Sequence, residues 1–449
     1  RFILGPEGEA LEREIATYCG TKHAIGCASG SDALLLCLLA QEVKAEDEVI
    51  TVPFTFFATA GAVARLGARA RFVDIAPRTF NLDPRALAQL LTALPGAERR
   101  RIRVVIPVHL YGQPAEMKEI LALANQYELA VIEDAAQAMG ADYGGRRVGS
   151  FGRAGCLSFY PTKNLGGYGD GGMVTTDDEA LASRLRALRQ HGSLGEKYRH
   201  DYVGFNSRLD ELQAAVLRVK LKYLEEWNAQ RRECALRYDR MFAESGLIEP
   251  SKTYPDASHP VVIPQRAAQC RHVFHQYVIR AQARDALKEF LAKEGVETEI
   301  YYPSPLHLQP CFHAWGYRRG DFAEAERAAE EVLPLPLYPG LTEELQAYVV
   351  SKLREFYRSV LTEKYDLVLV DCPPSLDLLT VNALTAATHM IVPVTTKFYA
   401  LKGMSLLGEM VATLHEQIGA TVKLLGILVT MFDKNTALDV TIYRLLKEK

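Results

Sequence analysis

The sequence predicts an α/β protein: a three-layer α/β/α domain comes first, then a smaller α+β domain, then a third segment of α/β character. Three observations lead to this prediction. Apolar runs of strand length alternate with amphipathic, helix-length segments from about residue 10 to 235. Several of the runs are continuously apolar, which is typical of a mostly parallel sheet covered by helices on both faces. Beyond residue 235 the pattern is mixed, and buried-type strands begin again after about residue 357.

The elements of the first domain follow from these patterns. Helices are expected at PAEMKEILALANQYE and DEALASRLRALRQHG, where apolar residues recur at helical spacing. Helical periodicity also continues through residues 207–242, which predicts one long helix leading out of the domain. The expected strands, in chain order, are HAIGCAS, DEVITVP, ARFVDI, RVVIPVHL, LAVIEDAA, GCLSFY and GGMVTT.

The rest of the chain completes the predicted organisation. FHQYVIRA is expected to be a strand, RDALKEFLAKEG a helix that ends at a glycine cap, YYPSPLHLQP a proline-rich loop and TEELQAYVVSKLREFYRSV a last helix. KYDLVLVDCPPS, HMIVPVTT and KLLGILVTMFD are three further buried-type strands. We therefore expect a large domain at 1–235, a small domain at 236–352 and an α/β fragment at 357–449.

Composition limits the possible functions. With 449 residues the chain is too long for one typical core, and its 48% hydrophobic and 24% charged residues are ordinary for a globular protein. A net charge of −3 gives no electrostatic footprint for nucleic acid or anionic lipid. The densest basic run, 99–103, is interpreted as a solvated loop that enters a strand.

The cysteine pattern bears on the cellular compartment of the protein. Eight cysteines lie far apart without a CxxC or metal-like spacing, which favours reduced thiols in the cytoplasm. No signal peptide and no apolar run of bilayer length is found. The sequence begins at Arg1 rather than Met, so we expect part of the natural start to precede it.

The stretch ASGSDALLLCLL predicts a strand end, a tight Ser29-Gly30-Ser31 turn and the start of an apolar helix. Free N–H groups and the helix dipole at such a point favour an anionic group, especially a phosphate. A plain N-cap explains the same residues, and both interpretations stay open at this point.

The stretch VIEDAAQAMGA ends an apolar strand with two carboxylates. The carboxyl end of a parallel strand is where such sheets place ligands, and Asp134 and Gln137 are spaced to converge on one ring-shaped ligand. An acidic cap for the following helix is the alternative.

The stretch LSFYPTKNLGGYGDGG places five glycines after Lys163. A phosphate-binding P-loop needs its glycines before the lysine and a Ser or Thr after it, whereas Asn164 follows here. The order therefore excludes a nucleotide cradle. A lysine after a strand, with Ser158 nearby, suits a Schiff base to an aldehyde cofactor, while an ordinary surface lysine is the alternative.

Taken together, a phosphate anchor, an aromatic-rich strand end (PFTFFAT), a carboxylate and a lysine have the chain order of a fold-type I pyridoxal-phosphate enzyme. Residues 1 to about 350 resemble the DegT/StrS family of nucleotide-sugar aminotransferases. The matching stretches are ILGPEGEALEREIATYCG, SGSDALLL, VITVPFTFFATAGAV, FVDIAPRTFNLDP, IPVHLYGQPAEM, VIEDAAQAMGADYGGRRVGSFG, LSFYPTKNLGGYGDGGMVTTDD, FNSRLDELQAAVLRVKL and YYPSPLHLQP.

The resemblance implies a role for each matching residue. Lys163 would bond to the cofactor, pyridoxal 5′-phosphate, and move the proton, and Asp134 would pair with the ring nitrogen so that the ring can act as an electron sink. Phe56 would stack on the ring. The remaining implied cofactor contacts are Gly30, Ser31 and Ser158 at the phosphate, Gln137 at the ring hydroxyl, and Asn206 at the phosphate of the neighbouring subunit.

The resemblance also bears on two histidines, for which a structural role is considered. His307 matches a residue near the substrate, with a structural loop histidine as the alternative, and His109 is interpreted as structural.

The implied reaction moves an amino group, usually from L-glutamate, to a keto group of a nucleotide-linked sugar. Such reactions serve amino-sugar synthesis for surface polysaccharides or secondary metabolites. The resemblance also implies a homodimer with shared sites, and the run after Ser158 looks more like members that act at C3 of the sugar than at C4. The family's first helix would precede Arg1.

The last segment resembles ParA-type partitioning ATPases over about 357–449, through YDLVLVDCPPSLDLLTVNAL, ATHMIVPVTTKFYALKGMSLL and LLGILVTMFDKNTALD. Asp371 ends an apolar run in the Walker B pattern, in which the carboxylate supports Mg²⁺. No GxxxxGK[ST] or KGGxGKT occurs anywhere in the sequence. Asp371 is therefore interpreted as a relic, no functional metal is expected, and a chimera of the two families is the preferred explanation.

Two other functions remain as alternatives. One is a ParA-like ATPase acting in chromosome or plasmid partitioning, which the missing loop disfavours. The other is a non-catalytic regulator that keeps the pyridoxal-phosphate fold, which the joint presence of Lys163, Asp134 and Gln137 disfavours.

Overall fold

The computed structural model describes residues 2–195, 198–364, 369–372, 378–395, 407–409, 411–413 and 422–431, with single residues or pairs at 434, 436, 440–441 and 443–444. The chain divides into two compact units, Arg1–Ser359 and Val360–Lys449. Among the described residues, none of the helices has both the length and the apolar character needed to cross a lipid bilayer.

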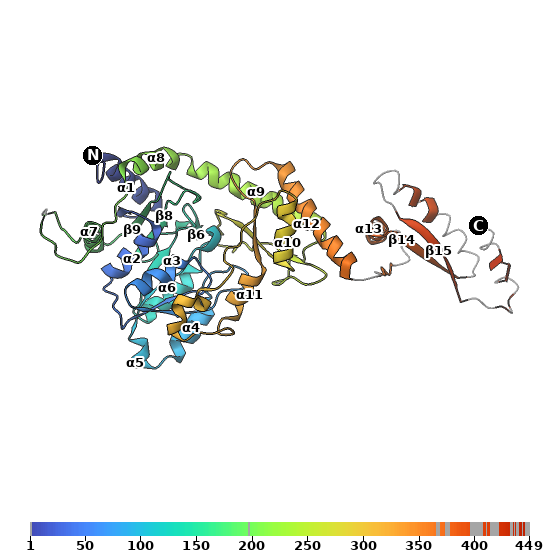
Figure 1. Cartoon of the computed structure of the whole chain (residues 1–449), viewed down its shortest axis with the longest axis horizontal. Helices are drawn as coiled ribbons and strands as arrows, with labels where there is room; N and C mark the ends of the chain where they lie inside the picture. Colours follow the sequence, from blue (N-terminus) through green and yellow to red (C-terminus); the bar gives the residue numbers. More distant parts are fainter. Residues whose placement is uncertain are drawn as a thin grey trace. The chain divides into compact units, whose positions relative to one another are not determined.

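A seven-stranded sheet forms the centre of the first unit (Figure 1). Its strand order is β1-β9-β8-β5-β4-β2-β3. β2, β3, β4, β5 and β8 pair in parallel, whereas β9 is antiparallel to both of its neighbours. The prediction of a mostly parallel sheet is therefore confirmed. Its strands are β1 (His23–Cys27), β2 (Glu48–Thr51), β3 (Arg69–Phe72), β4 (Ile102–Val105), β5 (Ala130–Asp134), β8 (Ala154–Ser158) and β9 (Gly172–Thr176).

Neighbouring residues along these strands are buried on opposite faces of the sheet. In β5, Val131 packs in one apolar cluster with helices α4 and α6, and Ile132 packs in another with α2 and α7. In β9, Met173 joins a cluster with α1 and α8, and Val174 joins that of α2. Because successive strand side chains point to opposite faces, helices must cover both, which confirms the three-layer architecture.

Short polar caps and glycines set where the helices begin and end. The side chain of Asp178 accepts from Leu181 N at the start of α7, and Gly20 ends α1 in the left-handed conformation (φ 75°). The helices of this part are α1 (Pro6–Cys19), α2 (Gly30–Ala40), α3 (Phe57–Arg65), α4 (Pro84–Ala93), α5 (Gly96–Arg99), α6 (Met117–Gln126) and α7 (Glu179–Leu188), with a 3₁₀ turn η1 (Leu110–Gly112).

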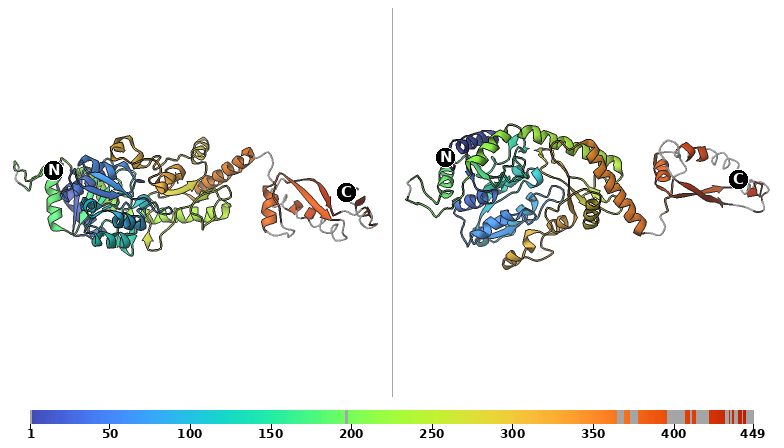
Figure 2. Two further views of the ribbon diagram at one scale, coloured as in Figure 1. Left: turned by 90° about the horizontal axis from the view of Figure 1, so that it is seen from below. Right: turned by 45° about the horizontal axis from the view of Figure 1, so that its top comes forward.

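The single long helix expected over 207–242 is wrong. Two helices form instead, α8 (Glu211–Leu221) and α9 (Leu224–Ser245), which follow one another along one side of the first unit (Figure 1, Figure 2). The break falls at Lys222 and Tyr223, where no proline or glycine marks it in the sequence.

A second, three-stranded antiparallel sheet, β10-β12-β13, lies in the part after α9. The predicted strand FHQYVIRA corresponds to β12, and the helix RDALKEFLAKEG to α10. These elements are β10 (Val261–Val262), β12 (Tyr277–Ala281), α10 (Arg284–Lys293), η2 (Leu306–Leu308), η3 (Pro310–Trp315), α11 (Ala323–Glu331), β13 (Val332–Leu335) and α12 (Glu343–Lys364). A small third sheet joins β11 (Cys270–Arg271), β6 (Asp142–Tyr143) and β7 (Arg146–Arg147).

The second unit contains α13 (Leu378–Ala386) and two parallel strands, β14 (His389–Thr395) and β15 (Lys423–Thr430). Both strands were predicted. The third expected strand, at KYDLVLVDCPPS, falls partly outside the described residues, and its described part, residues 369–372, is not a strand. Asp371 is exposed there, and no group of three potential metal-ligating side chains occurs among the described residues of the chain.

Candidate active site

The N-terminus of α2 forms a turn that is open to an anion. The hydroxyl of Ser29 accepts from Asp32 N (3.1 Å), so the plain N-cap interpretation holds for Ser29. This leaves the N–H groups of Gly30 and Ser31, together with the helix dipole, at the carboxyl edge of the sheet. A Cβ atom at Gly30 would lie 2.7 Å from Ser158 Cβ, so only glycine allows Ser158 to approach the turn this closely.

The turn is held from behind by a segment distant in sequence. The hydroxyl of Ser207 donates to Asp32 Oδ2 (2.7 Å) and accepts from Ala28 N (3.1 Å). Gly172, the first residue of β9, lies against the turn, because a Cβ there would come within 2.3 Å of the Ser29 carbonyl carbon. The turn at the N-terminus of α2 is therefore fixed by β9 and by residues just before α8.

Asp134 ends β5 and is almost fully buried (6% exposed). Its Oδ2 accepts from the hydroxyl of Thr59 (2.8 Å), and its Oδ1 accepts from Ala136 N (3.2 Å). Burial raises the pKa of this carboxyl, while these hydrogen bonds and the charge of Lys163 act in the opposite direction. The negative charge of Asp134 thus lies in a site where the protein alone does not fully neutralise it.

Lys163 lies in the loop between β8 and β9 and is largely buried, with part of its surface still open. Burial lowers the pKa of its ammonium to about 8, and the opposing effect of Asp134 shows that the two charges interact. An amine with this pKa is partly neutral near pH 7.5 and is therefore a competent nucleophile. The surface-lysine alternative does not describe Lys163.

The loop around Lys163 is anchored at the next residue. The Asn164 amide donates to Asn228 Oδ1 on α9 (2.7 Å) and to the Val273 carbonyl (3.3 Å). Gly166 is needed for the tight course of the loop, because a Cβ there would lie 2.2 Å from the Pro161 carbonyl oxygen. The glycines after Lys163 thus let the loop fold on itself and β9 pack on the α2 turn.

An aromatic wall stands beside Asp134. The Gln137 amide donates to the hydroxyl of Tyr302 (3.0 Å) and its Oε1 accepts from Tyr111 N (2.7 Å). The ring of Tyr302 lies 6.0 Å from that of Phe56, which is 54% exposed and so leaves a ring face open. Burial raises the pKa of Tyr302, and the charge of Asp134 contributes.

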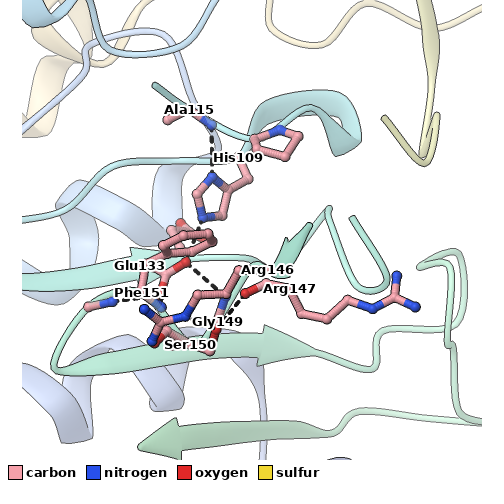
Figure 3. A network of polar contacts seen from close by, with 12 residues as sticks. His109, Ala115, Glu133, Arg146, Arg147, Gly149, Ser150 and Phe151 are labelled. Carbon is pink, nitrogen blue, oxygen red and sulfur yellow. Dashed lines mark hydrogen bonds and ion pairs between the residues drawn. The ribbon is translucent and has the colours of Figure 1, made fainter. Parts of the chain in front are cut away.

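Next to Asp134 in the chain, Glu133 belongs to a network of polar contacts in which its own side chain and that of His109 are fully buried (Figure 3). Its carboxylate accepts from the backbone N–H groups of Gly149, Phe151 and Gly152 (2.7–2.9 Å). His109 Nδ1 accepts from Ala115 N (3.0 Å), so the proton of the neutral ring lies on Nε2 and is donated to Glu133 (3.0 Å).

The backbone links this network to Asp134. The backbone N–H of His109 donates to the Asp134 carbonyl (3.0 Å). The network therefore fixes the strand end from which the Asp134 side chain projects, and the interpretation of His109 as structural fits this arrangement.

Two of the residues singled out in the sequence lie apart from this group. His307 is fully buried and its Nε2 pairs with Glu326 Oε1 (3.0 Å), which is the structural alternative stated for it. Asn206 is exposed, and its backbone forms a bridge with Gln190. The implied roles of both residues at a substrate or a neighbouring subunit stay predictions.

Residues that the sequence did not single out also belong to the site. Thr59 and Tyr302 contact Asp134 and Gln137, as described above. His275 is buried with Nδ1 unpartnered in the described part of the chain, and burial together with the charges of Lys163 and Arg231 lowers its pKa. Tyr302 and Thr59 lie within quoted stretches, YYPSPLHLQP and PFTFFAT, although neither was singled out. His275 gave no such signal, because only the fold brings it to the site.

Comparison with known proteins gives two family matches. The model of the DegT/DnrJ/EryC1/StrS aminotransferase family matches residues 1–354, and that of an AAA domain matches residues 342–424. The two matches overlap at the start of α12.

The relatives match about four fifths of this chain and about nine tenths of their own length. A pleiotropic regulatory protein of Geobacillus stearothermophilus is 51% identical over 80% of this chain and 91% of its own length. A UDP-N-acetyl-3-dehydro-α-D-glucosamine 3-aminotransferase of Acidithiobacillus ferrooxidans is 45% identical over 79% of this chain and 89% of its own length. The crystal structure of S. venezuelae DesV superposes with a TM-score of 0.73 at 40% identity, over 80% of this chain and 91% of that one.

Proposed function

Because the chain belongs to the DegT/DnrJ/EryC1/StrS aminotransferase family, whose cofactor is pyridoxal 5′-phosphate, we propose that it aminates a keto group of a nucleotide-linked sugar. The observation that carries the proposal is the placement of Lys163 and the buried carboxylate of Asp134 at the carboxyl end of the central sheet, together with the open N-terminus of α2. In the overall reaction an amino acid and a keto sugar give a keto acid and an amino sugar, so no oxidant or reductant is consumed.

The residues present fit the cofactor. A buried carboxylate whose pKa burial raises is suited to a cationic ring nitrogen, and the open N-terminus of α2 with Ser31 and Ser158 suits a phosphate. The exposed face of Phe56 offers a surface for a flat ring. When bound, pyridoxal 5′-phosphate supplies an electron sink for the carbon that exchanges its amino group.

We assign the following roles to the residues of the chain. Lys163, through Nζ, takes the proton from the donor carbon and returns it at the position where the amine is made. Asp134 keeps the ring nitrogen protonated, and Thr59 orients Asp134 through its hydrogen bond to Oδ2. Gln137 and Tyr302, which are hydrogen-bonded to each other, would hold one edge of the ring, and the Glu133 network fixes the strand end that carries Asp134.

L-Glutamate is the proposed donor, and the keto group is proposed at C3 of the sugar. The names of several relatives support the second point, since they specify a 3-amino or 3-oxo sugar. The 51% identical relative is named a regulatory protein. The joint presence of Lys163, Asp134 and Gln137 in one site supports catalysis over a non-catalytic regulator.

The proposal is tested in two half-reactions. L-Glutamate alone is expected to convert the holoenzyme from its aldehyde-form absorbance to the amine form, and a UDP- or dTDP-linked 3-keto sugar to restore the first spectrum. No spectral change with any amino donor would refute an aminotransferase. A change with glutamate but no return with a 3-keto or a 4-keto nucleotide sugar would refute the substrate class.

The pH dependence of cofactor capture tests the environment of Lys163. The neutral amine is the reactive form, so capture of pyridoxal 5′-phosphate by the cofactor-free protein is expected to accelerate as pH rises and to level off above about pH 8. At pH 7.5 about a quarter of an amine with this pKa is neutral, against about a thousandth for an ordinary lysine. Stopped-flow absorbance between pH 6.5 and 9.5 measures the rate. A tenfold rise per pH unit that continues to pH 9.5 would contradict the lowered pKa.

We further propose a homodimer in which Asn206 reaches the cofactor phosphate of the neighbouring subunit. The support is an exposed apolar surface on α8 and the adjoining loop. Leu212 and Val219 are seven residues apart on one helix face and are 78% and 58% exposed, and Tyr168, 79% exposed, joins α8 through its N–H to Gln213 Oε1.

Leu212→Glu is expected to weaken the dimer, because it places a charge in the middle of this apolar surface. Analytical ultracentrifugation is expected to show at least a tenfold higher dimer dissociation constant, together with loss of activity on dilution. Leu345→Glu, a similarly exposed leucine on α12, is the control. A wild-type protein that is active and monomeric would refute both the dimer and the role of Asn206.

We propose that the second unit adds no ATP hydrolysis to this chain. Although an AAA model matches residues 342–424, no GxxxxGK[ST] loop exists to hold a triphosphate. ATP hydrolysis that is lost in Asp371→Ala would refute this proposal. A cytoplasmic location is proposed as well, since all eight cysteines are free thiols.

A further inference from the structure

A cavity of about 960 Å³ opens at the edge of the central sheet opposite Asp134. It is lined by the first residues of β4 and β5, whereas Asp134 is the last residue of β5. At strand rise, Ala130 and Asp134 are about 13 Å apart, so the cavity is separate from the proposed active site. Its volume lies within the range of small-molecule sites in proteins.

Four arginines line this cavity. Three come from the basic run noted in the sequence, namely Arg99 at the end of α5, Arg100 in the following turn and Arg103 in β4. Arg153, just before β8, supplies the fourth. The run enters β4 and its residues Arg100, Arg101 and Arg103 are exposed, which agrees with the interpretation as a solvated loop entering a strand. In addition, three of its arginines line one cavity together with Arg153.

The positive charge of the cavity is largely uncompensated. Glu128 is the single acidic residue among the lining residues. Within the described part of the chain, the guanidinium group of Arg100 makes no hydrogen bond and no ion pair. Arg103 makes no close ion pair there, but its charge helps to lower the pKa of the Glu42 carboxyl. Arg153 pairs with Asp178 at 3.3 Å, and Arg99 lies over the ring of Tyr127, 5.3 Å from its centre. A concave surface lined by one sign of charge attracts ligands of the opposite sign.

We propose that this cavity binds the phosphate chain of a small anionic ligand, as found in pyrophosphate or a nucleoside diphosphate. Guanidinium groups present paired N–H donors that match phosphate oxygens, and a diphosphate spans two such groups. The volume leaves room for a nucleoside beside the phosphates. The site goes beyond the proposed amino transfer, and none of its four arginines belongs to the active site.

The experiment measures ADP and pyrophosphate binding to the full-length holoenzyme by isothermal titration calorimetry at 50 mM salt. R103E is expected to weaken ADP binding at least tenfold, and R100E/R103E to abolish it. R101E is the matched control, because Arg101 is exposed, carries the same charge change and lies two residues away but does not line the cavity. R101E is expected to change the affinity less than twofold.

Further measurements show whether the nucleoside contributes to binding and whether the variants are folded. If pyrophosphate binds as tightly as ADP, the phosphate chain alone is recognised, and if ADP binds at least tenfold more tightly, the nucleoside contributes. R100Q/R103Q and the thermal midpoint of each variant show that the protein remains folded.

Three results would overturn the proposal. Equal weakening by R101E and R103E would indicate diffuse charge, and unchanged binding in R100E/R103E would place the ligand elsewhere. Complete displacement of ADP by a saturating nucleotide sugar would place it in the active site.

Discussion

Replacing Lys163 by alanine is expected to lower the rate of amino transfer by a factor of about 10⁴, the upper end for loss of a positioned proton-transfer group. The variant loses both the amine that bonds to the cofactor and the base that moves the proton. Single-turnover absorbance after mixing with L-glutamate measures the rate. Borohydride reduction and peptide mapping of the wild type are expected to place the cofactor label on Lys163 alone.

Two controls separate this chemistry from a loss of structure. Lys222→Ala removes an exposed lysine and is expected to keep full activity. Burial lowers the pKa of Lys163 in the folded protein, so its charged form is disfavoured there at pH 7.5, and the thermal midpoint of Lys163→Ala without cofactor is expected to equal or exceed that of the wild type. A small primary amine added to Lys163→Ala is expected to restore part of the rate. A label on another lysine, or a variant with more than a tenth of wild-type activity, would show that Lys163 is not the catalytic amine.

Replacing Asp134 by asparagine is expected to slow amino transfer at least about 100-fold, because it removes the charge that would keep the ring nitrogen of the cofactor protonated. Asparagine has the size of aspartate and can still accept from Thr59 or Ala136, so the change mainly removes the charge. The affinity for the cofactor is expected to fall as well, measured by titration of the apoprotein at pH 7.5.

Stability without cofactor is expected to change in the opposite direction. Burial raises the pKa of Asp134 in the folded protein, so the folded state holds that proton more tightly than the unfolded state. The ionised carboxylate therefore lowers stability at every pH above its unfolded pKa, fully so above the folded pKa, and asparagine relieves this penalty. The thermal midpoint of cofactor-free Asp134→Asn at pH 7.5 is expected to rise.

Glu133→Gln is the matched control for this second result. Glu133 precedes Asp134 on the same strand, but its carboxylate accepts from three backbone N–H groups and from His109. An amide there leaves at least one buried donor without an acceptor, so the midpoint is expected to fall. Equal shifts of the midpoint in Asp134→Asn and Glu133→Gln would contradict the different roles assigned to the two carboxylates.

Glu133 and Asp134 show which features of the site could be predicted from the sequence and which could not. The pattern predicted that a strand ends at Glu133 and Asp134 and that its end would face a ligand. Alternation along a strand implies that the two side chains part, and the spacing of Asp134 and Gln137 favoured Asp134 as the one that meets the ligand, with an acidic helix cap as the alternative. That choice depends on contacts with Thr59 and with the backbone at Gly149, both distant in sequence.

The elements themselves were largely predictable, because continuous apolar runs mark strands that are buried on both faces. The error at 207–242 arose because helical periodicity continues through Lys222 and Tyr223, and only packing shows where α8 ends. His275 gave no signal, since its relation to Lys163 depends on two loops more than a hundred residues apart.

The antiparallel position of β9 has a consequence for folding. β8 and β9 pair along Gly155–Ser158 and are joined by residues 159–171, so the two ends of the Lys163 loop are brought together by contacts that are local in sequence. The α2 turn, by contrast, needs Ser207 and β9, more than a hundred residues away. Closing a long loop costs more chain entropy than closing a short one. We therefore expect the β8–β9 pair to form early in folding and the turn at Ser29–Ser31 to be completed late.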